Sequence, residues 1–571
     1  MSYTAPVETM LFTLRHVAGL DAARAEGWLA EPDDAALAAL LEAAGAFATA
    51  ELAPLNRVGD VHGARFADGA VTMPPGFAAA YRRWTAGGWN AVCASESAGG
   101  AGLPEAVGVA LLEIWTSACM AFALNPLLTQ AGVEVMQHFA PPELRALYLP
   151  KLVSGEWTAT MNLTEPQAGS DLGALRCRAE PAEGGTWRLF GQKIFITYGE
   201  HDLAENIAHL VLARLPDAPA GSRGISLFLV PKILPGGARN DVRCLGIEHK
   251  LGIHASPTCT MAYGEAGGAI GWLIGAPHQG LACMFTMMNH ARLTTGLQGV
   301  AVAERALQQA SAYAAARVQG NGPDGTPVPI AAHPDVRRML LSMQAGTQAG
   351  RALAYTVALA TDRARRHPDA AERAAAAARV GLLTPVMKAF GSELGVEAAS
   401  TGIQVHGGMG YIEETGAAQL LRDARIVPIY EGTNGIQAID LALRKVRRDG
   451  GAAARVEIAR MRAVAERVRG LNETGLGELG PILKEAAEAL NRATAWMAEP
   501  ERPELAILAV ATPYLKLFGM AAAGLVLAEG ALAAARSGGA ANAGATARFF
   551  AEHVLVAASG TARTVMRAAA S

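Results

Sequence analysis

The sequence predicts a mostly helical protein with a β domain near its middle. Between about residues 34 and 157, apolar residues recur with a helical period, as in the segment 35–52. Between about 158 and 277, short alternating or apolar runs such as 225–230 are separated by Gly, Pro and Asp, which is typical of strands and turns. The helical pattern returns from Gly280 and continues to the end of the chain. The predicted order is therefore helical, β, helical, and then an additional helical module.

Local signals place the boundaries of these elements. We expect Pro54 to end the helix over 35–52, because proline lacks a backbone N–H. Pro141 and Pro142 predict the first turn of another helix. Residues 321–329 are rich in Gly and Pro and predict a loop. The predicted domains are 1–157 (N-terminal helical), 158–277 (β), 278–450 (helical bundle) and 451–571 (additional helical module).

Composition excludes several classes of protein. A chain of 571 residues is too long for one core, and 51% hydrophobic with 18% charged residues is globular rather than disordered. A formal net charge of −3 provides no general attraction for nucleic acid or anionic lipid, so we expect neither as a partner. The six cysteines include no C-x-x-C pair, so we expect no metal site, reduced thiols and a cytoplasmic protein.

Two segments bear on membrane targeting. The N-terminus has Glu8 early and lacks a basic region followed by an apolar core, so we expect no signal peptide. The apolar stretch 505–535 is long enough to span a bilayer, but Pro513, Lys516 and Glu529 interrupt it. We expect this stretch to be a buried helix of a bundle.

The segment Ile426-Val-Pro-Ile-Tyr-Glu-Gly-Thr-Asn434 carries a single carboxylate, Glu431. An acid beside a Gly-Thr-Asn turn suits a general base, with backbone N–H groups of the turn available to an oxyanion or phosphate. The alternative is an acid near a helix start, stabilised by the helix dipole.

Two further segments have the composition of a ligand site. Met161-Asn-Leu-Thr-Glu-Pro-Gln-Ala-Gly-Ser-Asp171 leads from a strand into a loop in which Ser170 is a donor for phosphate or carbonyl oxygen. In Gly191-Gln-Lys-Ile-Phe-Ile-Thr197, Phe195 is suited to stack on a flat heteroaromatic ligand, and Thr197 is suited to form a hydrogen bond with it. Each segment taken alone is also compatible with ordinary hairpin chemistry.

Five motifs in order resemble the signatures of the acyl-CoA dehydrogenase family. They are Thr164-Glu-Pro-Gln-Ala-Gly-Ser-Asp171, Gly191-Gln-Lys-Ile-Phe-Ile-Thr197, Gln404-Val-His-Gly-Gly-Met-Gly-Tyr411, Arg422-Asp-Ala-Arg425 and Ile429-Tyr-Glu-Gly-Thr433. The resemblance covers roughly residues 35–445. The flanking regions and Met288-Asn-His-Ala-Arg292 also resemble the long bacterial branch of 3-methylmercaptopropionyl-CoA dehydrogenases.

The resemblance implies a fold and a reaction. The family has a helical N-domain, a β-barrel and a helical bundle, with FAD between the last two. It implies that Glu431 takes the α proton of an acyl-CoA thioester while the β hydride passes to flavin N5, which leaves the trans-2-enoyl-CoA. We expect a short-chain acyl-CoA or 3-methylthiopropionyl-CoA as substrate, electron-transfer flavoprotein as electron acceptor, and a homo-oligomer, a dimer in the simplest case.

The resemblance also assigns site residues. Those for FAD are Met161, Leu163, Thr164, Ser170, Phe195, Ile196, Thr197, Arg317, Gln319, Gln404, His406, Gly407, Gly408, Thr433 and Asn434. Those for the substrate are Ser170, Asn289, Arg292, Tyr430 and Gly432. The segment 404–408 would approach the FAD of a neighbouring subunit.

Three features depart from the family pattern. Phe195 stands where the family often has tryptophan, so stacking is kept but the indole N–H donor is lost. Gly320 and a Pro-rich loop replace the usual Phe-Gly after the arginine segment. The module 451–571 has no counterpart in shorter members.

Rival functions remain open at this point. An acyl-CoA oxidase would use the same base and let oxygen reach the reduced flavin. A nucleic-acid-binding relative of the alkylation-response type also has an extra C-terminal domain. Residues 451–571 carry 13 Lys or Arg against 11 Asp or Glu, which is too even for a DNA-binding surface. A purely structural helical protein would leave the ordered motifs unexplained.

Overall fold

The computed structural model describes residues 3–471, 474–537 and 542–567. The chain forms two compact units, each built from segments that are distant in sequence. The helical unit comprises Met1–Ala46, Pro104–Ser117 and Arg292–Ser571, and the mixed unit comprises Phe47–Leu103 and Ala118–Ala291. The division into four sequence domains stays a prediction, because compact units of this kind are not defined by continuous ranges.

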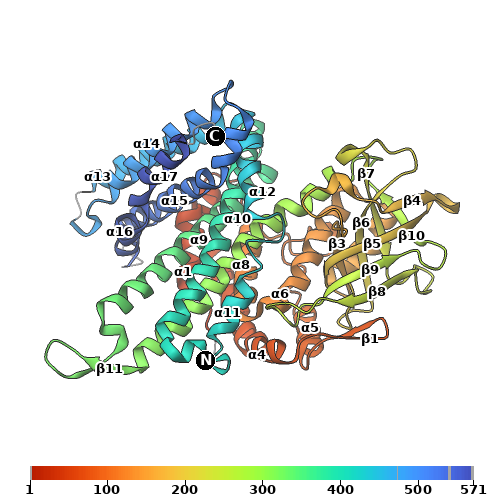
Figure 1. The fold of residues 1–571 in the computed structure, drawn as a ribbon, viewed down its shortest axis with the longest axis horizontal. Helices are drawn as coiled ribbons and strands as arrows, with labels where there is room; N and C mark the ends of the chain where they lie inside the picture. The colour runs from red at the N-terminus through yellow and green to blue at the C-terminus, as the bar shows by residue number, and fades with distance from the viewer. Residues whose placement is uncertain (1–2, 472–473, 538–541, 568–571) are drawn as a thin grey trace. The chain divides into compact units, whose positions relative to one another are not determined.

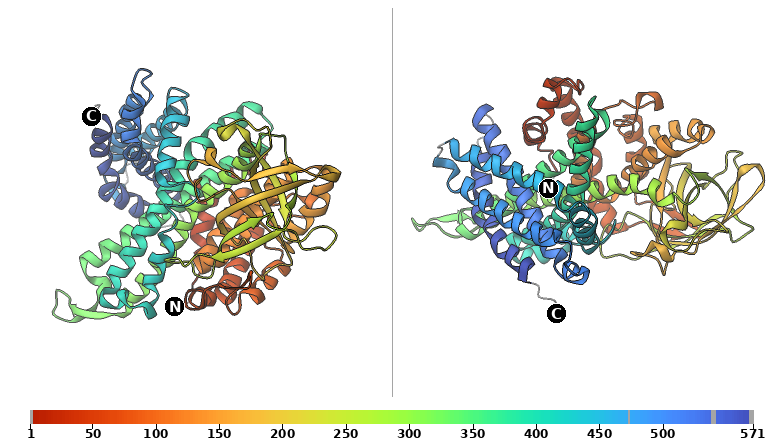
Figure 2. Two further views of the ribbon diagram at one scale, coloured as in Figure 1. Left: turned by 45° about the vertical axis from the view of Figure 1, so that its right-hand side comes forward. Right: turned by 90° about the horizontal axis from the view of Figure 1, so that it is seen from above.

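The mixed unit contains the predicted β-barrel, and the fold class is thereby confirmed (Figures 1 and 2). Strands β10, β7, β6, β4 and β5 follow one another in the sheet, and β5 pairs back with β10 to close the ring. Strand β3 pairs with β6, β9 with β5, and β8 with β9. The bounds are β3 (Trp157–Asn162), β4 (Arg178–Pro181), β5 (Trp187–Thr197), β6 (Asn206–Arg214), β7 (Ile225–Pro231), β8 (Val242–Ile247), β9 (Thr258–Tyr263) and β10 (Ala269–Ile274).

Apolar side chains fill the barrel. Leu189, Val211, Phe228 and Met261 belong to one buried cluster, to which β5, β6, β7 and β9 each contribute. Strands β6 and β7 are buried along nearly their whole length, as their near-continuous apolar runs predict. The barrel therefore forms a packed core and holds its surface loops on a rigid frame.

The other elements of the mixed unit include the predicted helix at Pro142. They are α4 (Ala53–His62), β1 (Arg65–Ala67), β2 (Ala70–Thr72), α5 (Phe77–Ala86) and α7 (Pro142–Ser154). The expectation that Pro54 ends a helix is wrong. α3 (Asp34–Phe47) continues through a π-helical turn (Ala48–Leu52) into α4, where Pro54 occupies the first turn, a position that needs no N–H donor.

Three long helices, α8 (Gly280–Ala316), α9 (Pro334–Arg366) and α10 (Ala370–His406), form the centre of the helical unit. In this unit, α8 and α10 meet backbone to backbone at glycines. A β-carbon at Gly299 would lie 1.9 Å from the carbonyl oxygen of Gly391, and one at Gly391 would lie 2.2 Å from that of Gly296. Only glycine permits so close an approach, which brings side chains of α8 and α10 near one another.

A buried ionic cluster joins further helices of the helical unit. Arg351 on α9 lies 2.6 Å from Glu113 on α6 (Glu105–Phe139) and 2.7 Å from Glu304 on α8. Glu113 also accepts a hydrogen bond from Tyr355 at 2.7 Å. Because buried charges are costly when unpaired, this set of partners fixes the packing of the three helices.

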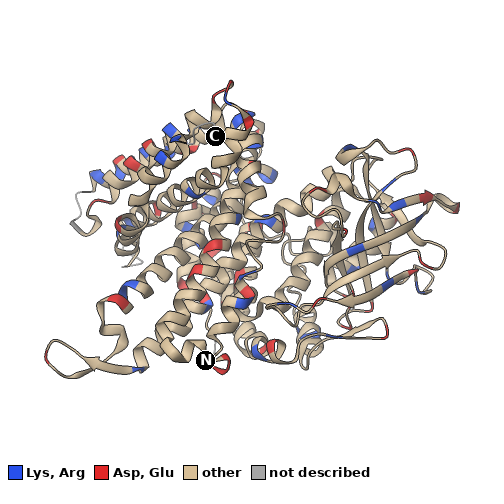
Figure 3. Cartoon of the chain, in the orientation of Figure 1, with Lys and Arg blue, Asp and Glu red and all other residues tan. Residues whose placement is uncertain are grey.

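The C-terminal module packs on this centre through α15, which contacts α9 and α10. The remaining helices are α1 (Val7–Phe12), α2 (Leu20–Ala25), α11 (Ala417–Ala424), α12 (Asn434–Ile439), α13 (Ala452–Gly470), α14 (Leu479–Ala498), α15 (Glu504–Ser537), α16 (Ala543–His553) and α17 (Ala558–Arg567). Basic and acidic residues alternate along α13 and α14, where Arg462 pairs with Glu488 and Lys484 with Glu466 (Figure 3).

Segment 321–329, predicted as a loop, is part of a hairpin of β11 (Val318–Asn321) and β12 (Pro327–Pro329). The Gly-Pro-rich sequence makes the turn, and the flanking residues pair. By length and apolar composition, three helices among the described residues could cross a membrane: Asp34–His62, Glu105–Phe139 and Glu504–Arg536. In the helix Glu504–Arg536, 83% of the most apolar window is buried inside the protein. The prediction of a buried helix over 505–535 is therefore confirmed.

Candidate active site

Glu431 lies in a short closed loop of the helical unit. The main-chain N–H of Asn434 donates to the carbonyl of Pro428 at 3.0 Å, which closes the loop around Glu431. Glu431 itself has a φ of 56° and Gly432 a φ of 82°. A left-handed glutamate is sterically disfavoured and persists where the surroundings impose it, a condition common at functional positions.

Two neighbouring side chains hold the main chain of this loop. The buried amide of Gln437 donates to the carbonyls of Glu431 and Gly432, both at 3.3 Å. Thr433 caps α12, and its hydroxyl oxygen accepts from the N–H of Ile436 at 3.2 Å. Since Thr433 performs the capping, the interpretation of Glu431 as a helix-start acid has no support in the geometry.

The Glu431 carboxyl is partly buried, and its surroundings act on its charge in opposite directions. Burial raises its pKa above the ordinary value, and the positive charges of Arg292 and Lys388 oppose that rise. Among the described residues, no group donates a hydrogen bond to this carboxylate. A carboxylate of raised basicity without hydrogen-bond donors is suited to accept a proton.

Arg292 and Lys388 reach this place from the two helices that touch at glycines. Arg292 on α8 is buried and lies 3.6 Å from Asp440. Lys388 on α10 is fully buried, and burial lowers its pKa to about 8. Tyr430 precedes Glu431, and its hydroxyl hydrogen-bonds Gln298. Sequence reasoning missed Lys388, although a lone lysine within the apolar run 382–390 was a usable signal.

A second group of predicted residues gathers where α8 and α10 end in the helical unit. The ring of His406 stacks on Tyr313 with a centroid distance of 4.4 Å, and Arg317 follows one turn after Tyr313. His406 Nδ1 lies 2.7 Å from the carbonyl of Gly402, while its buried Nε2 has no partner among the described residues. Gln404 is exposed beside it, and Gln319 accepts from Arg317 at 3.4 Å.

The glycines after His406 leave the backbone open. A β-carbon added at Gly407 or Gly408 would meet nothing within 4 Å, and Gly407 has a φ of 60°. Exposed backbone of this kind permits the close approach of a phosphate group. The open backbone fits the pyrophosphate part of a dinucleotide, whereas His406 donates through Nδ1 to Gly402, which leaves its Nε2 as an acceptor.

In the mixed unit, a β-bulge exposes Phe195. The pairing of β5 with β9 shifts register between Lys193 and Ile196, and Phe195 within this interval has a φ of 60° and is 58% exposed. Bulges re-aim side chains and recur beside active sites. An exposed aromatic on a rigid barrel strand fits a planar heteroaromatic ligand. Ile196 by contrast points into the barrel core, so only its main chain is available to such a ligand.

An ionic brace beneath this bulge ties β3 to β5. Lys193 Nζ donates to Glu165 at 2.8 Å and to the carbonyl of Leu163 at 3.0 Å, and the carbonyl of Thr164 accepts from Ile194 at 2.9 Å. Glu165 also accepts from the N–H groups of Arg176 and Cys177. Burial alone would raise the pKa of Glu165, but Lys193 and the two amides hold it below its ordinary value. Glu165 is therefore a structural acid rather than a second base.

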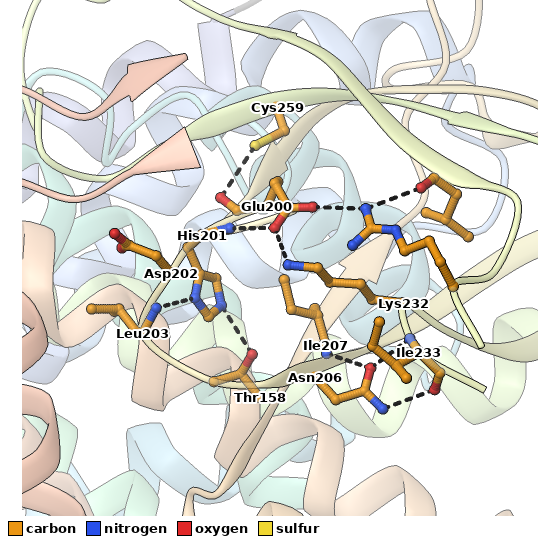
Figure 4. A network of polar contacts seen from close by, with 12 residues as sticks. Thr158, Glu200, His201, Asp202, Leu203, Asn206, Ile207, Lys232, Ile233 and Cys259 are labelled. Carbon is orange, nitrogen blue, oxygen red and sulfur yellow. Dashed lines mark hydrogen bonds and ion pairs between the residues drawn. The ribbon is translucent and has the colours of Figure 1, made fainter. Parts of the chain in front are cut away.

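The loop after β5 is fixed by the network in Figure 4. The buried carboxylate of Glu200 accepts from its neighbour His201 N–H at 3.1 Å and from Arg239 at 3.1 Å, and it also pairs with Lys232. His201 Nδ1 accepts from the N–H of Leu203 at 3.1 Å, so Nε2 carries the proton and donates to Thr158 at 3.0 Å. This network anchors the end of the strand that carries Phe195.

The remaining predicted residues of the mixed unit are spread over several elements. Met161 is buried on β3, Leu163 and Thr164 are half-buried just after it, and Thr197 is half-buried at the end of β5. Ser170 lies exposed in a loop, and Asn289 lies on the first part of α8. The structure thus brings predicted residues together around Glu431 and around His406, whereas those of the mixed unit lie on several elements.

Comparison with known proteins identifies the family. Family models match in four successive ranges: the acyl-CoA dehydrogenase N-terminal domain at residues 35–156, the middle domain at 160–265, the C-terminal domain at 278–445, and an acetyl-CoA dehydrogenase C-terminal-like domain at 457–571. The 3-methylmercaptopropionyl-CoA dehydrogenase of Ruegeria pomeroyi is 46% identical over 94% of this chain and 92% of its own. FadE5 of Mycobacterium tuberculosis, a broad-specificity linear acyl-CoA dehydrogenase, is 34% identical over 79% of this chain and 76% of its own.

Solved structures share the fold. Caenorhabditis elegans ACDH-11 in complex with C11-CoA has a TM-score of 0.80 at 20% identity, covering 97% of this chain and 93% of that one. An acyl-CoA dehydrogenase from Bacillus anthracis complexed with FAD has a TM-score of 0.72 at 23% identity, covering 86% of this chain and 82% of that one. The motifs, the fold and these relatives agree: the chain belongs to the acyl-CoA dehydrogenase family, whose cofactor is FAD, and it is an acyl-CoA dehydrogenase, an oxidoreductase.

Proposed function

We propose that the protein oxidises a short acyl-CoA thioester to the trans-2-enoyl-CoA, with Glu431 as the base that removes the α proton. The observation that carries this proposal is the position of Glu431. It combines a left-handed φ, a closed loop, partial burial and a carboxylate without a donor among the described residues.

Removal of the α proton is the difficult step, because the proton is bound to carbon. Desolvation makes Glu431 a stronger base than an exposed glutamate. The thioester oxygen gains negative charge as the proton leaves. The main-chain N–H of Glu431 donates to no acceptor in the described part of the chain, so it is available to that oxygen. One such donor contributes about 3 kcal/mol of transition-state stabilisation.

FAD, when bound, supplies the acceptor for the β hydride. Phe195, with Thr197, Thr164, Leu163 and Met161, would hold the flavin, and Ile196 would contribute main-chain groups. We assign the pyrophosphate and its surroundings to Ser170, Arg317, Gln319, Gln404, His406, Gly407, Gly408, Thr433 and Asn434. We assign the substrate to Ser170, Asn289, Arg292, Tyr430 and Gly432.

The substrate proposed is 3-methylthiopropionyl-CoA or a plain short-chain acyl-CoA. It rests on the relative that is 46% identical over nearly the full length and is named for 3-methylmercaptopropionyl-CoA. We also propose electron-transfer flavoprotein as the electron acceptor and a homodimer as the assembly, in which 404–408 of one subunit would approach the FAD of the other.

Glu431→Gln tests the base. The variant keeps the size and polarity of the side chain, so we expect it to retain FAD and bind acyl-CoA while flavin reduction and exchange of the α proton with solvent fall by about 10²–10⁴-fold. Stopped-flow absorbance under anaerobic conditions and deuterium incorporation are the measurements. Flavin reduction at near the wild-type rate would show that another residue is the base.

Anaerobic flavin bleaching with a panel of acyl-CoAs tests the substrate. We expect the highest kcat/KM with 3-methylthiopropionyl-CoA or with butyryl-CoA and its short-chain neighbours. A preference for chains much longer than these would contradict the proposal. Turnover in air, with peroxide as a product, would identify an oxidase instead of a dehydrogenase.

A further inference from the structure

Lys388 is fully buried in the middle of α10, yet its hydrogen-bond partner is neutral. Its Nζ donates to Oδ1 of Asn434 at 3.0 Å, and among the described residues no carboxylate lies within ion-pairing distance of it. Burying an ammonium is costly unless something compensates for the lost hydration. Because no carboxylate of the described residues pairs with Lys388, its charge can act on groups beyond hydrogen-bonding distance.

The amide of Asn434 has one chemically consistent orientation. Its Oδ1 accepts from Lys388, which has only donors, while its Nδ2 donates to the Glu393 carboxylate at 3.1 Å and to Ser392 Oγ at 3.1 Å. Ser392 in turn donates to the carbonyl of Ala389 at 3.0 Å. The side chain of Asn434 is thus held against α10 by three residues from successive turns.

Asn434 is also the residue that closes the Glu431 loop. Its N–H donates to Pro428, so the same residue is bound to α10 through its side chain and to the loop through its main chain. Lys388 is one of three residues of α10 that hold this side chain, and loss of its contact would weaken the attachment. The position of the Glu431 carboxylate therefore depends in part on a lysine that does not itself touch the loop backbone.

The charges that face Glu431 come from two helices. Arg292 on α8 and Lys388 on α10 are the cations that act on it, and Tyr430 adjoins it. The charge of Arg292 is shared with Asp440, at 3.6 Å, which also lies 3.7 Å from Arg444. Glu393 acts on Lys388. Arg292 has the larger effect on Glu431 and is also paired with Asp440, whereas Lys388 is the second cation and has no carboxylate within ion-pairing distance among the described residues.

We propose that Lys388 is a positioning residue of the reaction, which helps to hold the Glu431 loop against α10 through Asn434 and, together with Arg292, supplies positive charge that favours the ionised form of Glu431. This inference rests on the proposed role of Glu431. It assigns two separable effects to one side chain, a tether and a charge, and each predicts a different change in the pH profile.

Three variants separate the effects. Lys388→Met removes the charge and one of the three contacts of Asn434, Lys388→Gln removes the charge but keeps an N–H donor, and Asn434→Ala removes all three contacts but keeps the charge. We expect both Lys388 variants to raise the pH of half-maximal flavin reduction by about one unit, since a nearby opposite charge shifts a carboxyl pKa by one to three units. Asn434→Ala should lower the rate about tenfold or more at every pH without moving the midpoint.

A direct titration accompanies the kinetics. The carboxyl band of Glu431, identified in the infrared spectrum by its loss in Glu431→Gln, should titrate about one unit higher in Lys388→Gln than in the wild type. Lys388→Arg keeps the positive charge, so the carboxyl band of Glu431 should titrate with the wild-type midpoint. Lys516→Met, which removes an exposed lysine of α15, is the matched control for loss of one charge and should leave the midpoint unchanged.

The outcomes distinguish this inference from the proposed function. Wild-type midpoints in both Lys388 variants, in kinetics and in the infrared titration, would overturn the charge effect. An unchanged rate in Asn434→Ala would overturn the tether. If Glu431→Gln still reduces its flavin, the proposed base fails, whereas the infrared titration reports the Glu431 proton in either case.

Discussion

Two fully buried lysines, one in each unit, are held in opposite ways. In the mixed unit, Lys193 lies 2.8 Å from the buried carboxylate of Glu165, so its charge is neutralised locally. In the helical unit, Lys388 lies 3.0 Å from the amide oxygen of Asn434, which satisfies a hydrogen bond but neutralises nothing. Burial lowers the pKa of Lys388 to about 8, within reach of ordinary working pH.

The difference follows from what each lysine supports. Lys193 and Glu165 fasten the end of β3 to β5, where the requirement is a rigid strand under Phe195. A closed ion pair provides rigidity, and its two charges largely cancel at a distance. Lys388 acts on Glu431, the base proposed above, and a charge paired with a carboxylate would have little effect on Glu431. A buried lysine is thus structural or functional according to its partner rather than its burial.

The largest effect on stability is expected from Lys193→Met. It leaves the buried Glu165 without its cation, and breaking a buried ion pair by removing one partner costs about 3–5 kcal/mol. Hydrogen–deuterium exchange of β4 and β5, together with thermal unfolding, would report the loss. The double variant Lys193→Met/Glu165→Gln should recover much of it, because no buried charge is then left unpaired. A single variant as stable as the wild type would contradict the structural role.

The next effect is the pH dependence of the mixed unit. Burial and the charge of Lys232 lower the pKa of His201 from 6.5 to about 3, and burial likewise lowers that of His209 to about 3. Both are neutral when folded and take up a proton on unfolding below pH 6.5. Stability should therefore be lost as pH falls from 6.5 towards 3, by up to about 1.4 kcal/mol per pH unit for each histidine.

Thermal unfolding between pH 5 and 7.5 measures this dependence. His201→Gln keeps a donor for Thr158 and removes one titrating group, so the slope below pH 6.5 should decrease. His62→Gln changes an exposed histidine of α4 and should leave the slope unaltered. An identical slope in His201→Gln and the wild type would show that His201 is not a source of the dependence.

The smallest effect is expected at Thr433. Thr433→Ala removes the hydroxyl that caps α12, which costs about 1 kcal/mol, while Thr433→Ser keeps the cap. Urea unfolding of the apoprotein, with serine as the reference, isolates this contribution from FAD binding. Equal stability of the alanine and serine variants would show that the loop around Glu431 is held by Gln437 and Asn434 alone.

The sequence by itself determined the order of helical and β regions, the family and the chemical identity of Glu431. These depend on local patterns: the apolar period of helices, the alternation of strands, and motifs whose residues are neighbours in the chain. The misjudged boundaries have a local cause as well. Pro54 was expected to end a helix but begins the next turn, and the Gly-Pro-rich 321–329 turns inside a hairpin.

Only the tertiary structure decided what surrounds Glu431. Lys388 and Asn434 are 46 residues apart, and their contact depends on the packing of α10 against the loop. Arg292 and Lys388 come near because glycines let α8 and α10 touch. The bulge that exposes Phe195 and buries Ile196 arises from the pairing of β5 with β9. Burial and charge are properties of neighbours in space, so the reactivity of a residue follows from the fold even where its identity follows from the sequence.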